Sequence, residues 1–382
     1  MIGCSLRIAV LGLPVLALLT ALAVVLSSWP VPRSEAAVPQ LRLNQIQVVG
    51  SHNSYHLEPP QSEYGPISTV AGSVAQGLQY SHAPLDQQLA GQHVRQIELD
   101  LYADPKGGAY AKPAIRVLTG QKAEYDPRMK EPGTKVLHIA GIDYRSNCLS
   151  LVECLRSVKQ WSDGGPSHVP VAILLEFKDT LDIPVNGLPP IQLVTWTRER
   201  MLAAEEEILS VFPRERILAP DDVRVPGKTL EESVLQDGWP LLDDVRGKVM
   251  FLQDNNAVQR TRYLEGNPAL EGRLVFTAST PGQADAAFVQ RNDATSPSIR
   301  DLVSKGYMVR TRADSDTAEA RSGSTALRDQ ALAGGAQWVS TDYPVPGLAA
   351  RFGGGYYAAL PGFADARCNP VNAAGVCADL AG

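Results

Sequence analysis

The sequence has little cysteine and no concentration of positive charge. Five of its 382 residues are cysteine, too few for a small scaffold held together by disulfides. Its 35 basic residues are outnumbered by 41 acidic ones and are not clustered. Binding to a nucleic-acid backbone needs clustered lysine and arginine, so we expect no nucleic-acid partner. Hydrophobic residues make up 44% of the chain, a globular composition that excludes collagen-like and wholly disordered proteins.

One long apolar run stands near the N-terminus, and no later run is apolar enough to cross a membrane. Arg7 precedes the run Ile8–Leu26, and Ser34-Glu35-Ala36 offers small residues at the spacing that a signal peptidase reads. We therefore expect residues 1–36 to be a signal peptide and the rest to be secreted or extracytoplasmic. An uncleaved membrane anchor is the alternative, because about 19 apolar residues can span a bilayer.

The cysteines outside this leader fall into two close pairs. Cys4 belongs to the leader, and the pairs are Cys148 with Cys154 and Cys368 with Cys377. An oxidising compartment favours two local disulfides. Metal binding is the competing interpretation, but neither pair has zinc-knuckle spacing or a nearby histidine.

Eight short runs rich in Val, Ile and Leu alternate with helical patterns after residue 40. Such runs are typical of parallel strands buried on both faces, and eight of them favour a single closed (β/α)8 TIM-type barrel over residues 37–351. A Gly/Ala/Pro-rich tail, residues 352–382, follows and would be pinned by its disulfide. An open doubly wound sheet is disfavoured because no glycine-rich dinucleotide turn follows the first run. The runs are Ile46–Gly50, Gln96–Leu101, Lys135–Ile139, Val171–Phe177, Lys248–Leu252, Arg273–Thr277, Tyr307–Thr311 and Gln337–Thr341.

Charged side chains lie in or next to two of these runs. Glu98 and Asp100 are two residues apart, as are Glu176 and Lys178, and residues two apart on a strand share a face. Because the outer face packs on helices, these side chains should face the barrel interior near its C-terminal mouth. Three buried carboxylates that converge there require a cation, since unpaired buried charge is costly.

The donor atoms predict a hard divalent cation. Four protein oxygens are more than a Mg²⁺ site normally recruits, and the compartment is extracellular, so Ca²⁺ fits better. The alternative is a buried salt-bridge cluster involving Lys178 and Arg95. The predicted ligands are Asn53, Glu98, Asp100 and Glu176.

Two histidines at strand ends flank the acidic strand. His52 follows the first run and His138 lies in the third. A cation with two imidazoles suggests attack on a phosphodiester, in which one ring supports the transition state and the other protonates the leaving oxygen. Arg310 and Arg312, two apart on the seventh run, either face the substrate headgroup or form one rim charge and one salt bridge within the barrel.

Four motifs together resemble the X-region of calcium-dependent phosphoinositide-specific phospholipase C, most closely the secreted bacterial branch with a lone catalytic barrel. Each motif alone is weak, but their combination and order are specific, and the resemblance runs from the first strand to the tail. The motifs are Ser51-His52-Asn53-Ser54-Tyr55, Glu98-Leu99-Asp100, Val136-Leu137-His138 and Leu175-Glu176-Phe177-Lys178.

The resemblance implies a role for each matching residue. His52 would stabilise the phosphoryl transition state, His138 would be the general acid toward the diacylglycerol oxygen, and Lys178 would contact the substrate phosphate or an inositol hydroxyl. Ca²⁺ would bind the four ligands named above. The inositol 2-hydroxyl would attack its own phosphate, releasing diacylglycerol and a cyclic inositol phosphate. The implied substrate is a phospholipid at a membrane surface, and we expect a monomer without an obligate protein partner.

Two alternative functions share some of these sequence features. A glycerophosphodiester phosphodiesterase shares the barrel and a Glu-x-Asp on the second strand, but typically begins with His-Arg rather than His52-Asn53. A secreted calcium-stabilised binding barrel without turnover is the rival from another class. The pair His52 and His138 argues against it, because Ca²⁺ does not need imidazole ligands.

Overall fold

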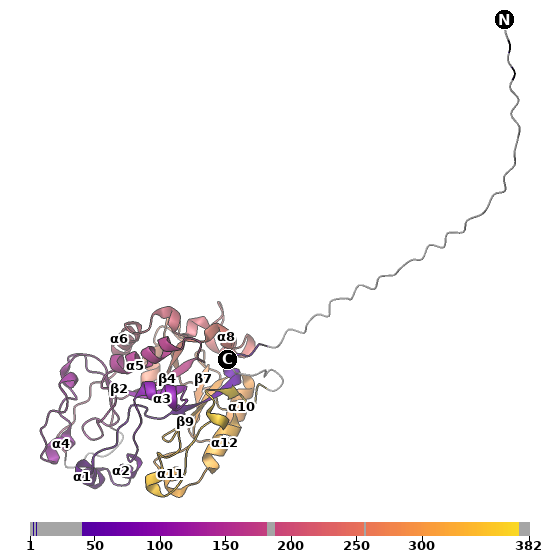
Figure 1. Ribbon diagram of the computed structural model, residues 1–382. Coiled ribbons are helices and arrows are strands. Elements are labelled where there is room, and N and C mark those ends of the chain that lie inside the picture. Colours follow the sequence, from indigo (N-terminus) through magenta and orange to yellow (C-terminus); the bar gives the residue numbers. More distant parts are fainter. Residues whose placement is uncertain (1–2, 4, 6–39, 182–187, 256, 374–382) are drawn as a thin grey trace. The chain divides into compact units, whose positions relative to one another are not determined.

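The computed structural model describes residues 3, 5, 40–181, 188–255 and 257–373 (Figure 1). Residues 39–382 form one compact unit. The predicted signal peptide, residues 1–36, lies outside the described residues apart from positions 3 and 5, and Cys377 lies outside them too. Among the described helices, none has the length and hydrophobicity needed to cross a bilayer.

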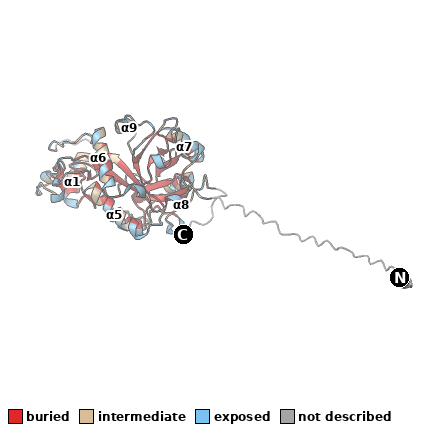
Figure 2. Ribbon diagram, turned by 90° about the horizontal axis from the view of Figure 1, so that it is seen from above, coloured by how far each residue is buried: buried red, intermediate tan, exposed pale blue. Residues whose placement is uncertain are grey.

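Eight parallel strands form the barrel of this unit. Going around it, the order is β6-β5-β4-β2-β1-β9-β8-β7, and a parallel bridge between Ala278 and Phe288 joins β6 to β7. The strands are buried on both faces, which explains their continuous apolar sequences (Figure 2). The predicted (β/α)8 class is confirmed. The strands are β1 (Ile46–Ser51), β2 (Gln96–Tyr102), β4 (Val171–Phe177), β5 (Val249–Gln253), β6 (Val275–Thr277), β7 (Phe288–Gln290), β8 (Met308–Arg312) and β9 (Trp338–Thr341).

The strand assignment was wrong at one predicted strand, and one strand was missed. The predicted third strand, Lys135–Ile139, forms only the short β3 (Lys135–Val136), which pairs antiparallel with the end of β2 outside the barrel. The missing barrel strand is β7, three residues long and joined to β6 by a loop without a helix in the described chain. Its apolar run was too short to separate from a loop by periodicity.

Helices cover the outside of the barrel, with their exposed faces turned to solvent (Figure 2). The longest, α5, buries Leu151, Leu155 and Val158 at helical spacing, and the Ser150 hydroxyl caps its first turn by accepting from the Glu153 amide. The helices are α1 (Gln61–Ala71), α2 (Val74–Gly77), α3 (Leu85–Gly91), α4 (Ala114–Leu118), α5 (Leu151–Gly164), α6 (Arg198–Leu209), α7 (Leu230–Gln236), α8 (Leu242–Val245), α9 (Val258–Leu264), α10 (Ser298–Lys305), α11 (Ala318–Ser322) and α12 (Ala326–Gly334).

The barrel consists of two four-stranded arcs with little backbone pairing between them. Strand β1 pairs with β2 at one residue pair, Gly50 with Gln96, whereas β2 and β4 pair over six residues. The β6–β7 contact is the bridge named above, extended by the Ser279 amide, which donates to the Phe288 carbonyl. We call β2, β4, β5 and β6 the first arc, and β7, β8, β9 and β1 the second arc.

The tail returns to the N-terminal end of β1. Strand β10 (Arg367–Cys368) pairs antiparallel with β1 through Ile46 and Gln47. Cys368 is disulfide-bonded, and its predicted partner Cys377 lies outside the described residues. Short 3-10 turns complete the chain: Leu43–Gln45, Pro127–Lys130, Arg214–Arg216, Pro220–Asp222, Ala350–Phe352 and Pro361–Phe363.

The predicted disulfide Cys148–Cys154 is present and joins the segment after β3 to α5. Because a closed loop of this length restricts the unfolded chain, replacing both cysteines by serine should lower the free energy of unfolding by about 2 kcal/mol. Urea unfolding under non-reducing conditions measures this change. An unchanged unfolding midpoint would contradict a stabilising role.

Candidate active site

The C-terminal ends of the barrel strands open into a polar cavity of about 550 Å³. Six of its lining residues are predicted site residues and come from both arcs: His52, Glu98, Glu176, Lys178, Arg310 and Arg312. The others are Asp254, Asn255, Ala257, Gln259, Gln290 and Asn292. The parallel strands therefore bring together residues that lie far apart in the sequence.

Three carboxylates meet in this cavity, each from a different strand end of the first arc. Glu98 lies on β2, Glu176 on β4 and Asp254 directly after β5, and each offers an oxygen within 4.8 Å of the others. We call these three the acidic group. Asp254 is held beside β4 because its amide donates to the Leu175 carbonyl at 2.9 Å. Sequence reasoning missed Asp254, whose only signal was an acidic residue just beyond a predicted strand.

A fourth carboxylate, Asp100, lies next to the acidic group without adequate partners. It lies directly opposite Glu176 on the neighbouring strand β4 and is only 1% exposed. Neither of its oxygens accepts a hydrogen bond from the described residues. The Lys178 Nζ lies 3.7 Å from Asp100 Oδ2 and 3.3 Å from Glu176 Oε1, so one ammonium serves two carboxylates.

Burial and mutual repulsion disfavour the ionised forms of these carboxyls. Burial is the main reason that the pKa of Glu98 rises to about 8, and it raises the pKa of Asp100 well above its usual value, with Glu176 adding to the effect. An added cation would reverse both shifts. The oxygen-only donors and the unsatisfied Asp100 fit a hard divalent ion such as Ca²⁺.

Asn53, the remaining predicted ligand, lies beside a second and smaller cavity of about 190 Å³. Its backbone is left-handed, with φ of 44°, and its amide nitrogen donates to the Tyr80 hydroxyl at 3.2 Å. The larger cavity is not lined by Asn53. Its role as a metal ligand stays a prediction.

His52, at the end of β1, lines both cavities. Its Nδ1 lies 2.9 Å from Asp342 Oδ1, and a carboxylate accepts, so Nδ1 carries the proton and Nε2 is left to face Glu98 Oε1 at 3.8 Å. Burial, helped by Arg312 and Arg310, lowers the pKa of His52 well below its usual value. Asp342 follows β9 and thus orients the ring, a role that spacing in the sequence did not reveal.

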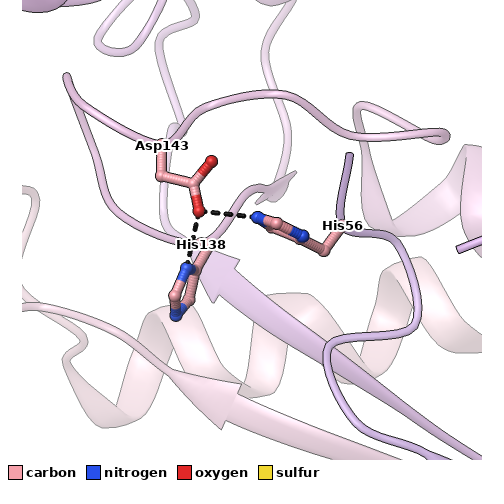
Figure 3. A group of neighbouring side chains, drawn as sticks. All are labelled: His56, His138 and Asp143. Carbon is pink, nitrogen blue, oxygen red and sulfur yellow. Dashed lines mark hydrogen bonds and ion pairs between the residues drawn. The ribbon is translucent and has the colours of Figure 1, made fainter. Parts of the chain in front are cut away.

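His138 does not lie on a barrel strand, contrary to prediction, but on the segment between β3 and α5. It nevertheless lines the smaller cavity together with His52, so the two predicted imidazoles do share a cavity. Its Nδ1 donates to Asp143 Oδ2 at 2.8 Å (Figure 3). Burial lowers the pKa of His138, and the Asp143 carboxylate opposes that effect only in part.

The two arginines of β8 have different surroundings. Arg310 is buried within the barrel, where its Nη2 binds Glu98 Oε2 at 2.6 Å and its Nε donates to the Ser340 hydroxyl at 2.9 Å. Arg312 lines both cavities and lies 3.5 Å from Asp342, and its Nε and Nη2 donate no hydrogen bond to the described residues. Arg312 is therefore the better placed of the two to bind an anionic group.

One known protein family matches most of this chain. A family model described as "Phosphoinositide phospholipase C, Ca2+-dependent" matches residues 41–370. No curated protein matches the chain. Among solved structures, it is similar to a calcium-dependent phosphoinositol-specific phospholipase C from Pseudomonas sp., with 18% identity over 87% of this chain and 97% of that one and a TM-score of 0.51.

A second solved structure, a Ca²⁺-dependent phosphatidylinositol-specific phospholipase C from Streptomyces antibioticus, is also similar. It has 16% identity over 80% of this chain and 95% of that one, with a TM-score of 0.50. The Pseudomonas protein has also been solved as a myoinositol complex, again with 18% identity, over 87% of this chain and 96% of that one, and a TM-score of 0.50. At such identities the likeness shows a shared barrel fold.

Proposed function

The chain belongs to the family of Ca²⁺-dependent phosphoinositide phospholipases C, and on that premise we propose that it cleaves phosphatidylinositol to diacylglycerol and a cyclic inositol phosphate. One observation carries the proposal. The acidic group, Glu98, Glu176 and Asp254, converges in a cavity that also contains His52 and Arg312. A cation site beside an imidazole and an available guanidinium suits a phosphodiester, whose charge increases in the transition state.

Ca²⁺ would be held by the acidic group, with Asp100 close by and Asn53 as a further predicted ligand. When bound, the ion would lower the pKa of the substrate hydroxyl and neutralise charge on the phosphoryl oxygens. Lys178 already contacts Glu176, and we assign it to the substrate phosphate or an inositol hydroxyl at the same edge of the cavity.

The reaction is an exchange of one phosphorus–oxygen bond for another. The inositol 2-hydroxyl oxygen bonds to phosphorus, and its proton passes to a carboxylate of the acidic group, which acts as the general base. His52 and Arg312 both line the two cavities, which places them beside the bound phosphate. There they would stabilise the charge that develops on the phosphoryl oxygens. The bond to the diacylglycerol oxygen then breaks.

His138 delivers a proton to that leaving oxygen. Because Asp143 holds the Nδ1 proton, a second proton taken up by the ring resides on Nε2. The carboxylate also stabilises the resulting imidazolium, as it does in other carboxylate–histidine pairs. General acid catalysis of this kind typically contributes about 10²–10⁴-fold to the rate.

We also propose that the chain works outside the cytosol, on lipid in a bilayer surface. Val74 on α2 is 43% exposed and borders the smaller cavity, and Val117 and Leu118 on α4 are similarly exposed. Helices α1, α2 and α4 lie together (Figure 1), so these apolar side chains belong to one region of the molecule. Apolar side chains exposed there could contact acyl chains.

The proposed function predicts a substrate preference that one assay can measure. Vesicles containing phosphatidylinositol should be hydrolysed with Ca²⁺, lose turnover in EGTA and regain it when Ca²⁺ is restored. Glycerophosphocholine, tested in parallel, should not be turned over. Turnover of glycerophosphocholine alone would support the glycerophosphodiester phosphodiesterase alternative, and calcium binding without turnover of either substrate would support the binding-barrel alternative.

A further inference from the structure

A second histidine, His56, is fully buried behind the candidate general acid. Its side chain is 0% exposed and lines neither cavity of the site. The ring lies between two acceptors, with Nδ1 3.1 Å from the Tyr80 carbonyl oxygen and Nε2 2.7 Å from Asp143 Oδ2. A carbonyl and an ionised carboxylate can only accept, so both ring nitrogens donate and the ring is an imidazolium.

Asp143 is ionised, which this assignment requires. Its burial opposes ionisation, but His56 and His138 together hold the pKa of Asp143 at about 2. The same oxygen, Oδ2, accepts from His56 Nε2 and from His138 Nδ1, and the two rings stand nearly perpendicular, 5.6 Å apart (Figure 3). The Asp143 Oδ2 oxygen thus links the buried His56 imidazolium to the His138 ring, which faces the smaller cavity.

The backbone shows which two segments the shared Asp143 oxygen joins. His138 and Asp143 lie at either end of one tight turn, closed by the Asp143 amide donating to the Ile139 carbonyl at 2.9 Å. This turn belongs to the segment outside the barrel, whereas His52 and His56 both lie on the segment that follows β1. His56 therefore connects the turn that bears one catalytic imidazole to the segment that bears the other, assisted by the bridge between His56 and Ser146.

We propose that His56 is a positioning residue, whose imidazolium acts through the shared Asp143 oxygen to fix the His138 ring with its proton on Nδ1 and its Nε2 toward the cavity. The inference rests on the proposed function in one respect, that His138 is the general acid. An Asp143 without His56 would carry an uncompensated buried charge and could rotate away from His138. His56 touches no substrate and contributes only through His138.

A double-mutant cycle tests whether His56 acts through His138. His56→Gln keeps a polar donor but removes the fixed charge, and we expect it to lower kcat roughly ten-fold or more with KM within about two-fold. In the His138→Ala background the same substitution should have no further effect, because the residue through which it acts is gone. His93→Gln is the matched control, since the His93 side chain is 40% exposed and pairs with Asp365. Equal losses in both backgrounds would show a merely structural role and overturn the proposal.

A second measurement uses the unaltered protein and does not depend on turnover or on the variant folding. Nitrogen-15 labelling of the six histidines and NMR of their ring nitrogens at pH 7.5 should show both His56 nitrogens protonated, and His138 protonated on Nδ1. A neutral His56, or a His138 whose proton is on Nε2 alone, would refute the inference. Absence of phosphatidylinositol turnover by the unaltered protein would instead refute the proposed function.

Discussion

His138→Ala is expected to lower kcat on phosphatidylinositol by about 10²–10⁴-fold while the fold and Ca²⁺ binding are retained. The imidazole lines the smaller cavity with its Nδ1 proton held by Asp143, so its loss removes a proton donor for the leaving oxygen. The side chain is 20% exposed and contacts none of the acidic group, so replacing it should disturb neither packing nor the ion. Initial rates on vesicles, calorimetric Ca²⁺ titration and thermal melting measure the three properties.

The leaving group offers a sharper version of this test. An inositol phosphodiester of a phenol needs little protonation to expel its oxygen, so His138→Ala should lose much less activity on it than on the natural diester. His93→Ala is the control, because His93 precedes β2 at the opposite end of the barrel from the mouth. An equal loss on both substrates would remove the general-acid assignment.

Asp254→Asn is expected to raise the Ca²⁺ concentration for half-maximal activity by about ten-fold or more. The substitution keeps the size of the side chain and removes one formal charge from the acidic group, and Ca²⁺ affinity depends strongly on ligand charge. Asp100→Asn should shift the requirement in the same direction, because Asp100 adds a carboxylate beside Glu176. Calorimetric titration of each variant with Ca²⁺ gives the dissociation constant without relying on turnover.

The position of the ion can be inferred from which variants have a changed Ca²⁺ dissociation constant. Asp301→Asn is the matched control, since Asp301 is exposed on α10 and pairs with Lys305. An unchanged Ca²⁺ constant for Asp254→Asn, together with a weakened one for Asn53→Ala, would place the ion beside the smaller cavity. Unchanged constants in Asp254→Asn, Asp100→Asn and Asn53→Ala would mean that the ion binds elsewhere.

The central strands were predictable because burial on both faces leaves a continuous apolar run, as in β4 and β5. The same signal failed for β3 and β7. Lys135–Val136 is buried yet pairs antiparallel outside the barrel, and nothing in its composition distinguishes that partner. Strand β7 is only three residues long, so its identity depends on neighbours far away in the sequence.

The positions of the candidate residues on regular strands were also predictable, whereas the carboxylates that hold the two histidine rings were not. The spacing of Glu98 and Asp100 by two residues fixed a common face, and both side chains are buried beside Glu176. The roles of Asp143 and Asp342 depend on the histidine rings that they contact. Asp143 is five residues from His138 in the sequence, and Asp342 is 290 residues from His52. A sequence read without contacts cannot distinguish such carboxylates from turn residues.

The division of the barrel into two arcs has an evolutionary consequence. The acidic group stands on the first arc, whereas His52 and both arginines stand on the second, and the Glu98–Arg310 ion pair joins the arcs where backbone pairing is sparse. A substitution that adapts Arg310 to a different headgroup would also weaken the attachment between the halves. We therefore expect Arg310 to be retained while substrate preference changes, because its ion pair with Glu98 also holds the two halves of the barrel together.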